Sequence, residues 1–432
     1  MNPWIKKALF SAFVLSLSLS AKAAVWKEVN QWDDSWEQKY SSWIQSEFNE
    51  DIFMVGKYKG LSTDCADAVY FSRIIFSYEN KLPFVITDPT GGKNKISNQM
   101  SRWDEKSELD RVRSFMSFVA WNVSTKSFAN DSYPIKINRT YVRAGAIWVR
   151  PSRETNIWNG IMATLTGKSK IIDPGHAEIV KRINESGSVM LIGSTTPQAV
   201  RRLTLTSSFL IMPESVNAGL RNWIWPQQYG LAKSSLPGFN VEQFSMGHSE
   251  TSNSTAPMGM GSAPSATDRK DGARNYQSWR AEVTQALAQR PETQQEAIDR
   301  YAGDLCSLVH SRAETVRQAL AVKNKKGQLC MNAEEYDAYS TPTRDKRIAA
   351  TLKDLSKMTS GFSGFSVSGK INNPEISKAL AKCDIIEIAD GQTLSLQEYM
   401  LHVAANKYSS DPNDSLKARW GFESGLSQCP RH

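Results

Sequence analysis

The apolar positions of residues 26–240 form short strand-like runs and longer Trp-rich stretches with helical spacing. Residues 141–150, 176–183 and 189–194 are three such short runs, and a turn that contains Gly187 separates the last two. Short β-like runs joined by glycine turns are typical of consecutive antiparallel strands. We therefore predict an antiparallel sheet in this part of the chain, with helices packed on it.

A buried helix is predicted to begin at Cys65. Asp64 is a favourable N-cap residue, and Asp67 then falls at the position that completes a reciprocal capping box. The following positions leave little polar surface: Ala66, Val69, Tyr70, Ile74, Ile75 and Tyr78. We expect this helix to be enclosed on most sides, with its first turn facing a cleft.

The chain changes character after residue 240. Residues 245–272 are rich in Ser, Gly, Met, Pro and Thr and have no periodic apolar face, which indicates a linker or a long loop. Helical spacing returns over 276–323, and further helices are predicted over 333–339, 347–358 and 394–406. We expect one domain over 24–240, a linker over 241–272 and a mostly α-helical module over 273–432.

Residues 1–23 have the pattern of a secretory leader. Lys6 and Lys7 precede an apolar run that ends in the small-residue triplet Ala21-Lys22-Ala23. This run is too short for a membrane span, which needs about 20 apolar residues, and no other segment reaches that length. The sequence therefore predicts an exported protein, periplasmic or extracellular, without an integral membrane segment.

The composition narrows the class of protein. The 432 residues include 52 Lys and Arg against 44 Asp and Glu, and 40% of them are hydrophobic. These values exclude a disordered, collagen-like or many-span membrane protein. No run of five basic residues occurs, so the net charge of +8 indicates no nucleic-acid partner. The charge suits an anionic envelope polymer, or it serves only solubility.

Five cysteines leave at least one unpaired in an oxidising compartment. Four of them lie in the C-terminal module, and among their three possible pairings proximity favours Cys306–Cys330 and Cys383–Cys429. Cys65 is then left over at the start of its helix, where free backbone N–H groups and the helix dipole favour a thiolate. The alternative is a small buried hydrophobic residue.

His176 is the histidine that shares a domain with Cys65, and it opens a predicted strand beside a loop. The other four lie in the linker, on helices of the second module or at the chain end: His248, His310, His402 and His432. In a Cys–His pair the imidazole stabilises the thiolate and later protonates the leaving amine, after the sulfur has attacked a carbonyl. Cys65 and His176 are therefore the candidate catalytic residues, unless both are ordinary core residues.

Three strings resemble the NlpC/P60 cysteine peptidases, papain-like hydrolases that act on cell-wall peptides. In chain order they are Asp64-Cys65-Ala66-Asp67 with Leu82-Pro83, residues 143–148, and Gly175-His176-Ala177-Glu178-Ile179-Val180. The resemblance covers residues 52–197, about a third of the chain, and the same strings also resemble transglutaminase-like cysteine proteins.

The resemblance implies an α+β fold with N-terminal helices packed on an antiparallel sheet. It also implies no cofactor, and peptidoglycan or another envelope peptide as the partner. Cys65 resembles the nucleophile, His176 the general base and acid, and Asp64 a residue beside the substrate amine.

The sequence departs from the NlpC/P60 pattern in three places. Ala66-Asp67 replaces a Ser-Gly pair after the cysteine, and an insertion lies around residues 91–138. The third polar residue of the family, which orients the histidine, would fall near Gly193, where glycine cannot act. Ser194, Thr195 or Glu178 could replace it, and Glu178 shares the strand face of His176 by the two-residue period.

Two functions of different classes remain. The first is an exported thiol hydrolase that cleaves an amide bond in a cell-wall peptide, with the helical module positioning it on the wall or a partner. The second is an envelope-binding protein of the same fold without a working catalytic triad, and a transglutaminase-like acyl transferase is a further alternative.

Other chemistries have little support in the sequence. There is no His-Glu-x-x-His, no Cys-x-x-Cys and no closely spaced His and Asp set, so no metal site is predicted. A Gly-rich phosphate loop is also missing. The near-helical spacing of Trp26, Trp32, Trp36 and Trp43 favours core packing over sugar stacking.

Overall fold

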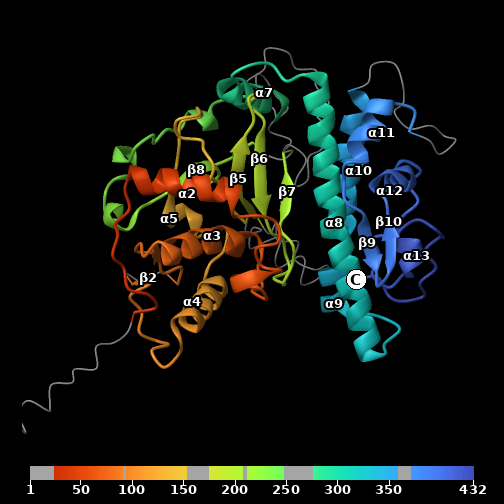
Figure 1. Ribbon diagram of the computed structural model, residues 1–432, viewed down its shortest axis with the longest axis horizontal. Helices are drawn as coiled ribbons and strands as arrows, with labels where there is room; N and C mark the ends of the chain where they lie inside the picture. The colour runs from red at the N-terminus through yellow and green to blue at the C-terminus, as the bar shows by residue number, and fades with distance from the viewer. Residues whose placement is uncertain (1–23, 91–93, 153–174, 208–211, 248–275, 359–370) are drawn as a thin grey trace, which may run out of the picture.

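The computed structural model describes residues 24–90, 94–152, 175–207, 212–247, 276–358 and 371–432. The expected leader over 1–23 and most of the expected linker lie outside them. Figure 1 shows a sheet-containing N-terminal part and a C-terminal part rich in helices. The long helix α8 (Gln294–Lys326) stands between the sheet edge and the other C-terminal elements. Helices and an antiparallel sheet both occur in the described residues, so the mixed α+β class is confirmed.

The predicted antiparallel sheet has six strands in the order β3-β8-β4-β5-β6-β7. All neighbouring strands run antiparallel. The strands are β3 (Ser132–Pro134), β8 (Gly219–Trp223), β4 (Ile147–Arg150), β5 (His176–Ile183), β6 (Val189–Gly193) and β7 (Thr204–Thr206). The predicted turn joins β5 to β6, and Gly187 allows it because its φ of +81° disfavours other residues.

One face of the sheet is covered by α2 (Asp34–Ser46) and α3 (Cys65–Glu79), and α4 (Glu108–Asn122) packs on α3. Shorter elements complete this layer: η1 (Gly56–Tyr58), α5 (Phe128–Asp131) and the hairpin of β1 (Val85–Thr87) and β2 (Lys95–Ser97). Trp26 and Trp32 are buried in its core, and their indole N–H groups donate to Leu82 O and Pro83 O. The prediction that the Trp-rich entry packs in the core is confirmed for both.

The other face of the sheet carries α7 (Tyr276–Leu287). Trp279 of α7 is fully buried with Trp148 of the sheet, and its indole donates to Gln243 O at 3.1 Å. The expected helical module over 273–432 includes α7, but the apolar face of α7 packs on the sheet, so that module begins near α8. Three short 3-10 turns follow β8 in the described chain: η2 (Pro226–Gln228), η3 (Lys233–Ser235) and η4 (Glu242–Phe244).

The expected start of the linker at residue 241 is also corrected. Gln243 is fully buried, and its Oε1 accepts from Leu220 N at 2.9 Å. Residues 241–247 are therefore part of the sheet-containing unit, because Gln243 satisfies the backbone of a central strand.

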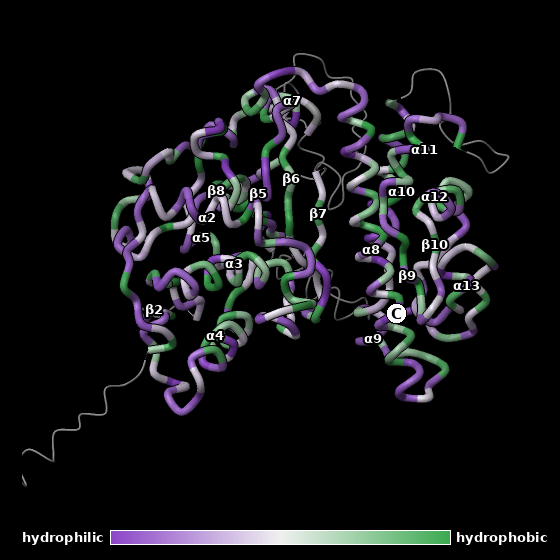
Figure 2. The backbone as a smooth tube through the Cα atoms, in the orientation of Figure 1, coloured by the Kyte–Doolittle hydropathy of each residue, from purple (hydrophilic) through white to green (hydrophobic). Residues whose placement is uncertain are grey.

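The C-terminal module packs helices and one hairpin around α8. Its elements are α9 (Ala333–Tyr339), α10 (Pro342–Lys357), α11 (Pro374–Leu380), β9 (Ile386–Ala389), β10 (Gln392–Leu394), α12 (Leu396–Ala404) and α13 (Leu416–Arg419). Figure 2 shows hydrophilic and hydrophobic positions alternating along α8, whereas β6 is hydrophobic along its length. A helix with this pattern covers a core on one side and meets polar groups on the other.

The two parts meet where the edge strand β7 lies against α8. Leu205 N donates to Ser307 Oγ at 2.7 Å, and Ser207 N donates to Asp304 Oδ1 at 2.7 Å. Asp304 is fully buried. Side chains of α8 thus satisfy the open edge of the sheet, which otherwise is an aggregation hazard.

The disulfide pairing predicted from proximity is wrong. The bridges are Cys306–Cys383 and Cys330–Cys429, and Cys65 is free as expected. Cys306 lies in α8, and Cys330 follows its end at Lys326. A rigid helix rises 1.5 Å per residue, so 20 residues of α8 separate Cys306 from the helix end before Cys330 by about 30 Å.

Within the described residues, no helix is both long and apolar enough to cross a bilayer.

Candidate active site

Cys65 occupies the first position of α3, where the predicted capping box is present. Asp64 Oδ1 accepts from Asp67 N at 3.0 Å, and Asp67 Oδ2 accepts from Asp64 N at 2.9 Å. The first N–H groups of an α-helix have no intrahelical acceptor, so positive partial charge collects beside the sulfur. Cys65 is only 3% exposed.

The segment before Cys65 is attached to the end of β6. Thr63 and Ala199 exchange two backbone hydrogen bonds, at 2.9 and 3.2 Å. Ser194 Oγ donates to Thr63 O, and Thr63 Oγ1 donates to Ser194 Oγ, both at 3.1 Å. These contacts fix the start of α3 against the sheet, and they occupy the hydroxyl of Ser194.

His176 opens β5, and the structure brings it to Cys65. Burial alone would lower the pKa of His176. The Glu178 carboxylate, together with the hydrogen bond and charge interaction between His176 and Cys65, raises this pKa to about 10. The ring is 23% exposed and lies 6.0 Å from the Trp148 ring, measured between centroids. The imidazole is therefore the accessible member of the pair, and its environment favours the protonated form.

Glu178 is the third member of this constellation. Its Oε2 lies 3.5 Å from His176 Nε2, and its side chain is 3% exposed. Burial opposes ionisation, but His176 holds the pKa of Glu178 below its usual value, with a contribution from Arg347. Glu178 Oε2 accepts no hydrogen bond of good geometry from the described residues. Its contact with His176 is therefore an ion pair at the long end of hydrogen-bond range.

Gly193 makes room for Glu178. A Cβ placed on Gly193 would lie 2.9 Å from Glu178 Cγ, closer than real Cβ contacts. The register explains this: Ile179 pairs with Ile192, so Glu178 lies beside Gly193 across the β5–β6 pair. A side chain at position 193 would therefore collide with Glu178, whose own side chain fills this space.

Asp64, expected beside a substrate amine, lies next to Cys65 and is half-buried. Its carboxylate caps the helix, as described above. The neighbouring Asp67 is 1% exposed, and burial together with the charge of Asp64 raises the pKa of Asp67 to about 7. Gln198 donates to Asp67 Oδ2 at 2.9 Å and ties this first turn to the loop after β6.

Sequence reasoning missed the contribution of the C-terminal module. Arg347 of α10 interacts with Glu178, and its Nη2 donates to Thr206 Oγ1 at 2.7 Å. Arg150 of β4 stands directly opposite His176 in the register. The β4–β5 pairing predicted from the sequence could have indicated Arg150, but no local signal links Arg347 to a site in the other module.

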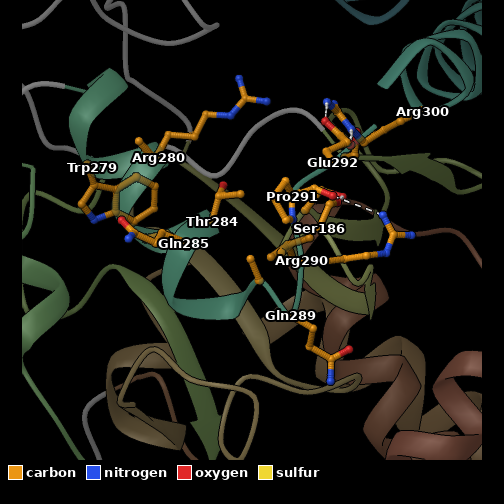
Figure 3. Close-up of a pocket in the computed structure, with 17 residues that line it drawn as sticks. Ser186, Trp279, Arg280, Thr284, Gln285, Gln289, Arg290, Pro291, Glu292 and Arg300 are labelled. Carbon is orange, nitrogen blue, oxygen red and sulfur yellow. Dashed lines mark hydrogen bonds and ion pairs between the residues drawn. The ribbon is translucent and has the colours of Figure 1, made fainter. Parts of the chain in front are cut away.

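A cavity of about 710 Å³ lies away from Cys65, between the β5–β6 turn, α7 and the start of α8. Figure 3 shows Glu292 facing Arg300 at one end of this cavity and Arg280 extending at the other end. Arg290 pairs with Glu185 and Glu296. Its lining residues include no cysteine or histidine, so it offers no nucleophile and base pair.

One group in the described residues has metal-ligand spacing: Cys306, His310 and Cys383. Its two sulfurs are joined in a disulfide, and His310 Nε2 lies 3.8 Å from Cys383 Sγ. A bridged sulfur is not a thiolate ligand, so with the disulfide intact this group leaves one nitrogen donor.

No protein-family model, curated protein or solved structure matches this chain.

Proposed function

We propose that this protein is an exported thiol hydrolase of the papain-like NlpC/P60 type, which cleaves an amide bond in a cell-wall peptide. One observation carries the proposal: a free cysteine at a helix start interacts with a histidine whose other side faces a buried carboxylate. Cysteine, base and orienting group in this order are the parts that acyl transfer by a thiol requires.

The mechanism follows from the placement of the three side chains. His176 Nε2 faces Glu178, which leaves Nδ1 for Cys65. The sulfur attacks the carbonyl carbon, and backbone N–H groups at the start of α3 stabilise the oxyanion. His176 gives its proton to the amine as the C–N bond breaks, and the acyl group remains on Cys65 as a thioester. His176 then takes a proton from the water that attacks the thioester, and the thiolate is released.

The compartment and partner belong to the same proposal. Two disulfides fit a protein that folds in an oxidising compartment, as the predicted leader also indicates. The helical module supplies Arg347, whose charge acts on Glu178 in the candidate site. In this proposal the module also positions the enzyme on the wall.

The test is release of soluble peptides from purified peptidoglycan by the wild-type protein and by Cys65→Ala. We expect release by the wild type and none by the variant. Equal release by both would refute the thiol mechanism. No release by either, from protein shown to be folded, would refute hydrolysis of this substrate.

A second function is favoured by one observation, the 3% exposure of Cys65. A nearly enclosed thiol also suits a wall-binding protein that keeps the fold without catalysis. Because the other four cysteines are bridged, iodoacetamide reports on Cys65 alone. A catalytic thiol should be labelled rapidly in the native protein and more slowly in His176→Gln; labelling only after unfolding supports the binding protein.

A further inference from the structure

The candidate site is surrounded by arginines from both parts of the chain. Arg150 lies opposite His176 on β4, and Arg201 lies in the loop after β6. Arg344 and Arg347 are one turn apart on α10, and Arg347 interacts with Glu178. The helix α10 thus presents its arginines toward the end of the sheet where Cys65 and His176 meet.

Arg344 lacks acceptors for two of its three guanidinium nitrogens among the described residues. Its Nε and Nη2 atoms are enclosed and have no hydrogen-bond partner among the described residues. The adjacent carboxylate of Asp345 is already engaged by Arg312, Thr341 and Ser410. Enclosed N–H groups of a cation without acceptors are strongly destabilising, which indicates that another group meets Arg344 when the protein works.

Arg201 stands beside the helix start and is 6% exposed. Its Nη2 donates to Pro197 O, while its Nε is enclosed and has no partner among the described residues. The Thr63–Ala199 bridge holds this loop next to the segment that leads into Cys65. Burial lowers the pKa of Arg201, and the carboxylates of Glu314 and Asp64 partly oppose this effect.

The loop of Arg201 lies near the helix that carries Arg344. Gln318 of α8 donates to Val200 O at 2.9 Å, and α10 packs along α8. Burial, and then the charge of Arg201, lowers the pKa of Arg344 to about 10. Two neighbouring guanidinium groups with unpartnered N–H groups match an anion that both can bind, because a carboxylate accepts two parallel N–H bonds from one arginine.

We propose that Arg344 and Arg201 form a carboxylate-binding subsite, and that the substrate is a peptide with a free carboxylate close to the amide bond that is cleaved. This inference rests on the proposed function for the identity of the substrate. The subsite itself rests on the enclosed, unpartnered nitrogens of two arginines from different modules.

The experiment measures thermal unfolding of full-length Cys65→Ala protein with glutarate or glutaramide at matched ionic strength. The two probes have nearly the same shape and differ in charge. Ligands that bind the folded state raise the melting temperature. We expect glutarate to raise it, glutaramide to leave it unchanged, and Arg344→Gln to weaken glutarate binding by roughly tenfold or more.

Lys346→Gln is the matched control, because it removes the same charge from an exposed position of α10. It should retain glutarate binding. Equal losses in Arg344→Gln and Lys346→Gln would reduce the effect to general electrostatics and overturn the proposal, as would glutarate binding unaffected by Arg344→Gln. Since Arg344 Nε and Nη2 have no acceptor among the described residues, the variant without ligand should melt no lower than the parent, which separates a binding defect from misfolding.

The outcome is independent of turnover, because the protein used has no catalytic thiol. Glutarate binding together with undiminished peptide release by Cys65→Ala would sink the proposed hydrolase and keep the anion subsite. Peptide release that needs Cys65, without glutarate binding, would sink the subsite and keep the hydrolase.

Discussion

Glu178→Gln removes the buried negative charge beside His176 and nearly preserves the side-chain shape. Raising the pKa of His176 from 6.5 to about 10 corresponds to ~5 kcal/mol of stabilisation of the imidazolium. Coulomb's law with an effective dielectric constant of 20 gives a similar ~5 kcal/mol for unit charges 3.5 Å apart. Cys65 supplies part of the stabilisation and solvent screens the ring, so we assign ~2–3 kcal/mol to Glu178.

The assay is a titration of the His176 ring by NMR, combined with rates of peptide release. In Glu178→Gln we expect the pKa of His176 to fall to about 8 and the rate to fall about 10²-fold, as ~2–3 kcal/mol implies. The control is Glu185→Gln, since Glu185 is an exposed carboxylate in the β5–β6 turn. An unchanged His176 titration in Glu178→Gln would refute the role given to this carboxylate.

Three further outcomes are expected. Gly193→Ala should lose ~1–3 kcal/mol of stability in urea, because its Cβ meets Glu178 Cγ at 2.9 Å, and a similar loss in a Glu178→Ala background would disprove that clash. The extra stability of the wild type over Glu178→Gln should be complete below pH 6.5, where His176 is protonated in both states, and be lost as the pH rises through about 10. On the acid side it should decline only as Glu178 is protonated below its ordinary range; denaturation midpoints across the pH range check both limbs, and a pH-independent difference would count against the ion pair. Reduction of the two bridges, which span 77 and 99 residues, should cost about 4–5 kcal/mol each in the chain-entropy model, so an unchanged melting temperature in reductant would contradict their stabilising role.

The sequence alone determined the features that depend on neighbours in the chain. The start of α3 at Cys65 was predictable because a capping box uses residues three apart. The β5–β6 hairpin was predictable because alternation and a glycine turn are local signals. The unpaired state of Cys65 followed from an odd number of cysteines and its distance from the other four.

The tertiary structure decided which distant groups meet. The sequence placed Glu178 on the strand face of His176 but left Ser194 and Thr195 as alternatives. The register of β5 and β6 puts Gly193 beside Glu178, and Thr63 engages the hydroxyl of Ser194. The disulfides differ from the pairing by proximity because a rigid helix separates residues that are near in sequence. Arg344 and Arg347 reach the site because α8 holds the C-terminal helices against the sheet, and such packing depends on whole surfaces rather than on any short segment.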